Sequence, residues 1–510
     1  MRLTIFVLAV LLADSLSAQS LRRRPPSLDP RFPPAWPGFA ANAQHTALAP
    51  VPSQTLSRIR WQTPVDLAPQ YSGGELFIHY GSPLITSHNT VIVPVKTGAS
   101  SGFRVEAHEA SDGSLKWSAT TDYTLPPSDW IPEFEPTLTI TARAGTRLYY
   151  PGAGGTVYFR DDPDSASGAS GQIAFYGLDN YISNRAAYDS SVIINTPLTA
   201  DASGNVYFGF LVNGSTPAGL SSGIARISST GEGTWISAAA AATDPAITGV
   251  AYNCAPAISA ETGTLYLAVS NGYNGAGYLL ALNSATLQTT ARTPLQDPYT
   301  GVDATLSSDG SASPTIGPDG DVYFGVLESS GENHYRGWLL HFDAGLTRSK
   351  IPGAFGWDDT ASIVPASMVP SYRGSSSYLL MTKYNDYKEA GGSGVNRIAV
   401  LDPNSTETDP ITGTITMKEV LTIAGVTPDP ALPAVKEWCI NSAAVDPATN
   451  SILAGSEDGK LYRWDLTTNT FSESIVLTPG LGEAYTPTIV GPDGTVYAIN
   501  NATLFAVGED

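Results

Sequence analysis

The sequence predicts an all-β protein, a single eight-bladed β-propeller built from four-stranded antiparallel blades. Charged residues make up only 15% of the 510-residue chain, which also contains 49 glycines and 38 prolines. This balance favours many short strands joined by turns. A strand pattern recurs eight times, at intervals of about 44 to 78 residues, which is typical of propeller blades. Because repeats can fill a long chain with one body, we expect one domain.

The first element is a secretory signal. Met1 and Arg2 precede an apolar run over 3–13, and small and polar residues follow to Ala18. We therefore expect a signal peptide over 1–18, an N-terminal extension over 19–55 and a propeller over 56–510. This order predicts a secreted or periplasmic protein, and no later stretch has the roughly 18 uninterrupted apolar residues of a membrane span.

Each repeat begins with a proline or small residue and a short apolar run, the expected innermost strand. The eight anchor residues are Pro83, Pro136, Pro197, Pro256, Pro314, Pro365, Ala443 and Pro487. In the clearest copies an Asp-Ala-Ser-Gly or Gly-Pro-Asp-Gly turn follows, at 201–204, 317–320 and 491–494. Such turns join antiparallel strands into hairpins.

The later strands of each repeat are rich in Val, Ile, Leu and aromatic residues. Second strands are expected near 90–93, 147–150, 205–209, 264–267, 321–325, 378–380, 451–453 and 495–497. Third strands are clearest at 102–108, 277–283, 337–343 and 460–465, and fourth strands open at 112–117 and 231–235.

The two ends of the chain are expected to close the ring. The last repeat stops after its third strand, 503–507, and lacks an outer strand. Residues 57–64 can supply it, because Trp61 stands there as Trp117 and Trp235 stand in other outer strands. We predict that 57–64 pairs with 504–507, which removes a sheet edge.

The repeat resembles that of the quinoprotein alcohol dehydrogenase-like, or PQQ-like, β-propellers, over about residues 56–510. Upstream residues also resemble the lead-in segment of secreted members, namely Trp36, Asn42, Gln44, His45 and Thr46. Enzymes of this family hold a quinone and Ca²⁺ over the central funnel with Glu, Asn and Asp ligands. No such ligand motif is matched here residue by residue, so we predict no cofactor and keep PQQ with Ca²⁺ as the alternative.

Connections into the innermost strands gather at one mouth of a propeller's channel. In this chain they place an aromatic residue beside a carboxylate or amide. The candidate ligand site comprises Asp129, Trp130, Glu133, Tyr252, Asn253, Tyr299, Asp303, Trp357, Asp358, Asp359, Glu437, Trp438, Glu483 and Tyr485. Such a mouth suits a glycan, a cationic peptide or Ca²⁺. The alternative is that the tryptophans pack between blades and the acids are solvated.

The two cysteines, Cys254 and Cys439, each precede an innermost strand, in the fourth and seventh units. We expect both on the mouth side. A disulfide between them requires loops that reach across the channel, because inner strands three blades apart lie beyond the roughly 7 Å limit between Cα atoms. The alternative is two buried thiols.

The formal net charge of −20 opposes binding to nucleic acid. The sequence therefore predicts a monomeric, non-enzymatic binding or scaffold propeller whose partner is a protein, peptide or glycan. Two alternatives remain open: a diverged PQQ-dependent dehydrogenase and an envelope protein-assembly factor. The lipid-anchored assembly factor with a similar repeat carries a lipidation cysteine, which this chain lacks at the expected cleavage site.

Overall fold

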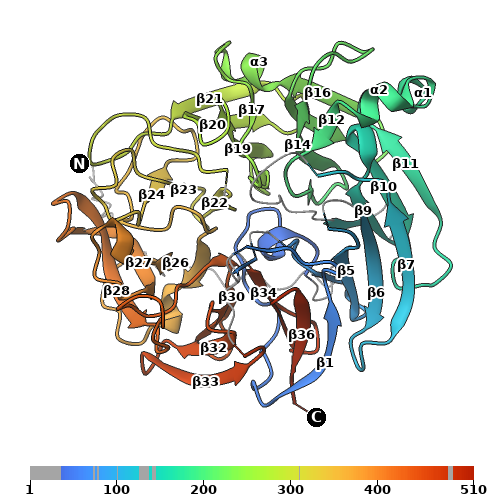
Figure 1. Ribbon diagram of the computed structural model, residues 1–510. Coiled ribbons are helices and arrows are strands. Elements are labelled where there is room, and N and C mark those ends of the chain that lie inside the picture. The colour runs from blue at the N-terminus through green and yellow to red at the C-terminus, as the bar shows by residue number, and fades with distance from the viewer. Residues whose placement is uncertain are drawn as a thin grey trace, which may run out of the picture. The chain divides into compact units, whose positions relative to one another are not determined.

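The computed structural model describes residues 36–72, 75–76, 80–99, 102–125, 137–140, 145–308, 310–479 and 486–509. All of them belong to one compact unit, 34–510. Within it, eight antiparallel sheets stand around a central axis in chain order, which confirms the predicted eight-bladed propeller (Figure 1). The expected signal peptide lies outside the described residues. In the described part, no helix is both long and apolar enough to traverse a bilayer.

The first four blades follow one another along the first part of the ring. Blade 1 contains β4 (Leu84–Ile85), β5 (Thr90–Lys96), β6 (Phe103–Glu109) and β7 (Leu115–Thr121). Blade 2 contains β8 (Thr137–Ile140), β9 (Thr146–Pro151), β10 (Thr156–Asp161) and β11 (Ser170–Ala174). Blade 3 contains β12 (Val192–Ile194), β13 (Thr199–Ala200), β14 (Val206–Val212), β15 (Gly223–Ile227) and β16 (Gly233–Ser237). Blade 4 contains β17 (Gly249–Val250), β18 (Ala257–Ile258), β19 (Thr264–Ser270), β20 (Gly277–Asn283) and β21 (Thr289–Pro294).

The remaining four blades complete the ring. Blade 5 contains β22 (Thr315–Ile316), β23 (Val322–Val326) and β24 (Trp338–Phe342). Blade 6 contains β25 (Ser362–Pro365), β26 (Tyr378–Tyr384), β27 (Arg397–Thr408) and β28 (Ile415–Ala424). Blade 7 contains β30 (Ala444–Asp446), β31 (Ser451–Gly455), β32 (Lys460–Asp465) and β33 (Thr470–Val476). Blade 8 contains β34 (Thr486–Val490), β35 (Val496–Asn500), β36 (Thr503–Gly508) and β1 (Arg58–Pro64), and β29 (Ile440–Ser442) runs parallel to β34.

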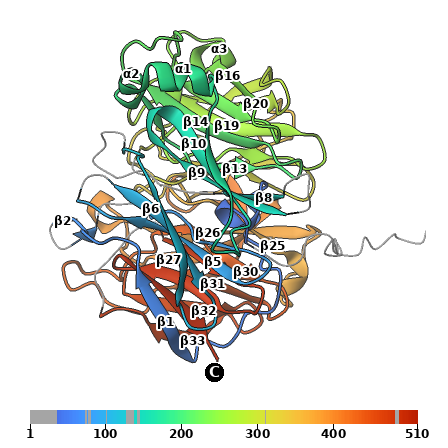
Figure 2. The ribbon, with the colours of Figure 1, turned by 90° about the vertical axis from the view of Figure 1, so that its right-hand side faces the viewer.

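Few other elements interrupt the blades. A small hairpin joins β2 (Tyr71–Ser72) to β3 (Glu75–Leu76). Short helices α1 (Leu178–Ser183), α2 (Arg185–Asp189) and α3 (Ala238–Ala242) lie at the outer edge of the ring, beside blades 2 to 4 (Figures 1 and 2). Single 3₁₀ turns are η1 (Phe39–Ala41), η2 (Ala153–Gly155), η3 (Ala366–Met368) and η4 (Lys388–Ala390).

Burial falls from the axis to the rim. Every residue of β5 and β26 is buried, whereas exposed positions alternate along β21 and β33. A strand covered on both faces selects a continuous apolar run, and a half-solvated outer strand selects alternation. This gradient explains why the second strands stand out in the sequence as apolar runs, whereas the fourth strands do not.

The Asp-Gly turns form as the repeat predicted. Gly204, Gly320 and Gly494 have φ of 82°, 89° and 83°, in the left-handed region that glycine adopts without strain. In the first of these turns the Asp201 carboxylate accepts hydrogen bonds from the amides of Ser203 and Asn205. Turn chemistry in the sequence therefore fixes where each hairpin reverses.

The ring closes between the chain ends, as predicted. β1 pairs antiparallel with β36, and Gln62 lies opposite Phe505 and Thr63 opposite Leu504. The Trp61 indole donates a hydrogen bond of 2.8 Å to the carbonyl of Ala110 in blade 1. The outer strand of blade 8 thus also anchors the neighbouring blade.

The N-terminal extension fills the centre of the ring. Its segment from Trp36 to Leu48, coloured blue in Figure 1, runs among the inner strands of several blades. Its backbone hydrogen bonds to the inner strands reach Ile85, Ile258, Ile316, Ile363 and Val445, in blades 1, 4, 5, 6 and 7. Burial lowers the pKa of His45 to about 4, so this ring is neutral at pH 7. We call residues 36–48 the axial segment.

Two details differ from the sequence-based expectation. Pro365 ends the inner strand of blade 6 instead of preceding it, because β25 begins at Ser362. Blade 5 has three regular strands, and isolated bridges such as Leu339 to Gly353 take the place of a fourth. The predicted four-stranded blade is therefore incomplete at this one position of the ring.

Candidate functional site

The mouth of the propeller is the end at which inner strands begin. Because neighbouring strands are antiparallel, the turns between second and third strands lie at this same end. In blades 6 and 7 these connections bring together segments 357–359, 383–387, 437–439 and 456–457. We call the titratable groups gathered there the mouth cluster, comprising Asp358, Asp359, Lys383, Glu437, Cys439 and Glu457.

A buried ion pair lies at the centre of the mouth cluster. The Lys383 ammonium pairs with the Asp358 carboxylate, and both side chains are almost completely buried. Lys383 also donates a hydrogen bond of 3.2 Å to the hydroxyl of Tyr387, and its ammonium lies 5.3 Å from the centre of the half-buried Trp357 ring. The carboxylate raises the pKa of Lys383 well above its usual value despite the opposing effect of burial. Lys383 therefore keeps its positive charge beside Asp358.

Asp359 lies next to this pair, and its carboxyl group has a raised pKa. Burial raises its pKa to about 7, although the Lys383 charge lowers it. Its carboxylate accepts hydrogen bonds from the Thr382 hydroxyl at 3.0 Å and the Lys383 backbone amide at 3.1 Å. Asp359 thus gains or loses a proton near neutral pH.

Glu437, Cys439 and Glu457 converge at the outer side of the cluster. One ligand atom from each lies within 4.8 Å of the others, and both carboxylates are half-buried while Cys439 is buried. The Cys439 thiol lies 3.8 Å from the Glu437 carboxylate. Burial and the Glu457 charge raise the pKa of Glu437 to about 8. Like charges in this space favour uptake of a proton or another cation.

The aromatic and amide groups hold the cluster in place. The Asn385 side chain bridges to blade 7, donating to the Trp438 carbonyl at 3.0 Å and accepting from its amide at 3.2 Å. The Trp438 ring is fully buried and packs 5.5 Å from Tyr462 and 5.7 Å from Phe471, measured between ring centres. Trp438 is therefore a packing residue, as the alternative interpretation allowed.

The structure unites some of the predicted mouth residues and separates others. Trp357, Asp358, Asp359 and Glu437 meet in the cluster between blades 6 and 7. Tyr252, Tyr299 and Asp303 belong to the connections of blades 4 and 5; Tyr299 and Asp303 are exposed, and Tyr252 packs against Tyr273. Asn253 is buried and donates to the Gly310 carbonyl. Asp129, Trp130, Glu133, Glu483 and Tyr485 lie outside the described residues.

Sequence reasoning missed Lys383, Tyr387 and Glu457. Lys383 did leave a signal, since it is a charge inside the otherwise apolar strand β26. A buried charge requires a partner of opposite charge. A lysine inside an apolar strand therefore predicts a buried carboxylate nearby. Glu457 directly precedes Asp458 and Gly459 in a common turn sequence, and it carries no such signal.

The two cysteines are free thiols, and both are buried. The Cys254 sulfur accepts a hydrogen bond from the Ala268 amide within blade 4, at 3.3 Å. Cys439 instead joins the mouth cluster. The disulfide that the sequence left open is not formed, and the alternative of two buried thiols holds.

A quinone with Ca²⁺, which the resemblance implies, requires several oxygen ligands free to bind the ion. Asp358 is neutralised by Lys383, and the Asp359 oxygens accept from Thr382 and Lys383. In addition, the axial segment runs through the centre of the ring. The described mouth residues therefore do not fit this cofactor.

No protein-family model matches the chain, and comparison with curated proteins gives no match. Solved structures do match. A europium-containing methanol dehydrogenase is 11% identical, with a TM-score of 0.54, over 91% of this chain and 89% of that one. The quinohemoprotein alcohol dehydrogenase of Comamonas testosteroni is 11% identical, with a TM-score of 0.56, over 94% and 81%.

A third similar structure is the quinohemoprotein alcohol dehydrogenase ADHIIG of Pseudomonas putida HK5. It is 13% identical, with a TM-score of 0.52, over 94% of this chain and 76% of that one. At such identities the likeness concerns the fold, which is that of the PQQ-type β-propellers. Function has to be argued from the site.

Proposed function

We propose that this protein is a non-catalytic binding propeller that acts outside the cytoplasm, and that its mouth binds a divalent metal cation of the Zn²⁺ class. The observation that carries the proposal is the convergence of Glu437, Cys439 and Glu457 within 4.8 Å. The signal-like N-terminus supports the location, and the charge of −20 supports a cationic ligand.

The donor set favours zinc over calcium. Zn²⁺ binds thiolate at about 2.3 Å and carboxylate at about 2.0–2.2 Å, whereas Ca²⁺ takes oxygen ligands only. Two such bonds span at most about 4.5 Å, so small side-chain shifts bring all three groups to one ion. Three protein ligands leave a fourth position for water or for a group of a binding partner.

The surrounding charges balance in favour of a cation. Glu437 lies under the influence of three other carboxylates, Glu457, Glu389 and Asp358, and of one ammonium, Lys383. The carboxylates among these neighbours outnumber the ammonium group, and together with burial they raise the pKa of Glu437 to about 8. A metal ion displaces the proton that otherwise neutralises Glu437.

Isothermal titration of the purified protein with ZnCl₂ tests this function. We expect one site, lost in Cys439→Ser and weakened at least about tenfold in Glu457→Gln, because each removes one ligand. Glu261→Gln, in an exposed turn of blade 4, is the matched control and should bind as the parent does. Equal binding by all four proteins contradicts the site.

A parallel assay tests the non-catalytic part of the proposal. The protein is incubated with PQQ and Ca²⁺, and dye reduction is followed with alcohols and sugars. We expect no turnover above the protein-free control, because Asp358 is paired with Lys383 and the Asp359 oxygens already accept hydrogen bonds from Thr382 and Lys383. Robust turnover would make the protein a dehydrogenase and overturn the binding function.

A further inference from the structure

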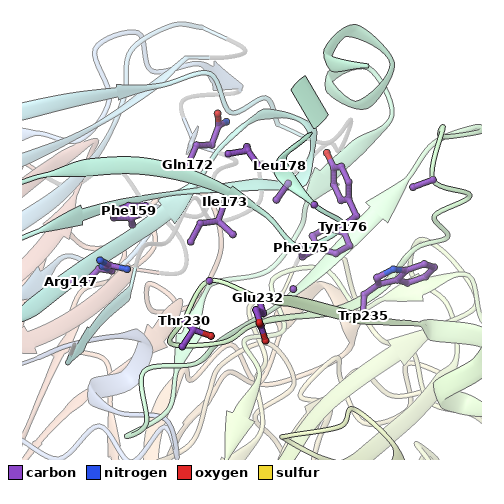
Figure 3. Close-up of a pocket in the computed structure, with 15 residues that line it drawn as sticks. Arg147, Phe159, Gln172, Ile173, Phe175, Tyr176, Leu178, Thr230, Glu232 and Trp235 are labelled. Carbon is purple, nitrogen blue, oxygen red and sulfur yellow. The ribbon is translucent and has the colours of Figure 1, made fainter. Parts of the chain in front are cut away.

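A groove between blades 2 and 3 lies at the outer part of the ring, apart from the mouth cluster. It has a volume of about 810 Å³ and is bounded by strands β9 to β11, helix α1 and the start of β16. Figure 3 shows Arg147 and Phe159 at one end and Trp235 at the other, with Ile173 and Glu232 between them. The volume is that of a small-ligand site.

Trp235 reaches this groove because of its strand register. Trp61 and Trp117, in the outer strands of blades 8 and 1, each donate a hydrogen bond to the following blade, at Ala110 and Pro163. In both blades a bulge shifts the outer strand, between Ile59 and Trp61 in one and opposite Ala107 in the other. The β15–β16 pair has continuous register.

A one-residue shift in register turns a side chain to the opposite face of a sheet. Trp235 therefore faces the preceding blade 2, where it lines the groove beside Phe175. It is half-buried, packs edge-on against Phe210 at 6.1 Å between ring centres, and its indole N–H has no hydrogen-bond partner among the described residues. Trp61 and Trp117 join neighbouring blades through their indole N–H groups, whereas the indole of Trp235 is available to a ligand.

The polar groups of the groove include both donors and acceptors. The exposed Glu232 carboxylate makes no hydrogen bond or ion pair with any described residue. Gln172 uses its amide N–H on the Thr156 hydroxyl at 2.8 Å, which leaves its carbonyl oxygen as an acceptor. Arg147 pairs with Asp161 through two nitrogens, and its third nitrogen donates to the Tyr149 hydroxyl at 3.4 Å, which leaves one N–H on that nitrogen for a ligand.

This combination selects the chemical class of the ligand. A cation would need only acceptors and an anion only donors, whereas sugar hydroxyls are both. Arg147 is already compensated by Asp161, so the groove adds only the exposed, solvent-screened charge of Glu232, and its hydrogen-bonding groups rather than its charge select the ligand. The half-buried Trp235 ring supplies an apolar face against which the C–H face of a sugar ring can pack, whereas one face of the Phe159 ring is already covered by the Arg147 guanidinium, 4.2 Å from the ring centre.

We infer that the groove between blades 2 and 3 binds a neutral oligosaccharide, with Trp235 as the stacking platform and Glu232, Gln172 and Arg147 as hydrogen-bonding partners. This site is independent of the metal cation proposed at the mouth. A propeller with both sites would hold a glycan at its rim and another partner at its mouth.

The inference is tested by titrating maltotetraose, cellotetraose and N-acetylchitotetraose into the full chain, followed by calorimetry and tryptophan fluorescence. We expect at least one of them to bind, Trp235→Ala to weaken it about tenfold or more, and Trp235→Phe to retain most of the affinity. Glu232→Gln, an exposed change that leaves the core intact, should weaken it several-fold.

Tyr335→Ala is the matched control, since Tyr335 is an exposed aromatic residue of blade 5 that lies outside the groove and outside the candidate mouth residues. It should bind the saccharide as the parent protein does. The inference is overturned if none of the three saccharides binds at millimolar concentration, or if Trp235→Ala and Glu232→Gln bind as tightly as the parent.

Discussion

Charged side chains buried at the mouth make single-residue changes informative there. Lys383 and Asp358 form an ion pair almost without solvent contact, and the second carboxylate oxygen of Asp358 has no hydrogen-bond partner in the described structure. Removing one partner of such a pair costs more stability than replacing both partners. The reason is that a single charge left alone in the interior is costly.

Lys383→Met should therefore lower the free energy of unfolding by about 3–5 kcal/mol. The double variant Lys383→Met with Asp358→Asn should recover part of that loss. Lys116→Met, which removes a partly exposed pair with Glu109 and a hydrogen bond to the Thr90 hydroxyl, should cost only about 1–2 kcal/mol. Urea denaturation measures all three, and equal losses for Lys383→Met and Lys116→Met would contradict the buried pair.

Asp359 makes stability depend on pH. Its pKa rises from 3.8 to about 7 on folding, so the folded state holds a proton that the unfolded state releases. The stabilisation is complete below pH 3.8 and is lost as the pH rises to about 7, by at most about 1.4 kcal/mol per pH unit.

Asp359→Asn should remove this contribution, because an amide can bond to Thr382 and the Lys383 backbone without titrating. Between pH 5 and pH 7 the variant should thus gain stability relative to the parent, and the gain should level off by pH 8. The urea midpoints of the parent and the variant at pH 5, 7 and 8 measure this difference in stability. A difference that does not change with pH would show that Asp359 does not titrate in this range.

At the scale of elements, strand β1 and the axial segment hold the ring together from the N-terminal side. β1 completes blade 8, and the axial segment hydrogen bonds to five inner strands. Removing them leaves β36 as an open edge, and open edges pair with other chains.

A chain that begins at residue 65 should therefore aggregate and melt at a lower temperature, whereas a chain that begins at residue 36 should remain monomeric. Size-exclusion chromatography and thermal melting distinguish the two. If the shorter chain stays monomeric with an unchanged melting temperature, closure by β1 does not stabilise the ring.

The blades themselves could be predicted because each local signal agrees with the fold. Continuous apolar runs mark buried second strands, Asp-Gly turns mark hairpins, and the unfinished last repeat pointed to β1. The irregular fourth strand of blade 5 could not be predicted, because isolated bridges such as Leu339 to Gly353 leave no periodic pattern. The face of the sheet on which Trp235 lies could not be predicted either. It depends on the absence from blade 3 of the bulge that the outer strands of blades 8 and 1 contain.

The candidate site was predicted only in part. Trp357, Asp358, Asp359 and Glu437 all come from inner-strand connections, and the structure brings them together because the repeat fixes where such connections lie. Lys383 lies near the end of the second strand of blade 6, and Glu457 lies in the turn after the second strand of blade 7, where the sequence pattern predicts no mouth residue. Glu457 donates its backbone amide to the Glu437 carbonyl within blade 7, whereas the approach of Lys383 depends on how blades 6 and 7 pack, which no single repeat determines.

At the scale of the whole molecule, the state of the two thiols shows whether a disulfide links blades 4 and 7. Cys254 lies in blade 4 and Cys439 at blade 7, and both are free and buried. Under denaturing conditions without reductant, intact-mass analysis should show two alkylated cysteines, and prior reduction should not change the mass. A protein that takes up alkylating agent only after reduction would contain the disulfide instead.

The central claim is that the whole propeller serves to hold a metal cation at its mouth. Anomalous diffraction at the zinc edge, from crystals of the full chain grown with ZnCl₂, tests it most directly. We predict one strong peak about 2.3 Å from the Cys439 sulfur and about 2.1 Å from carboxylate oxygens of Glu437 and Glu457. A map without a peak between these three side chains, at a zinc concentration that saturates the protein in solution, would contradict the account.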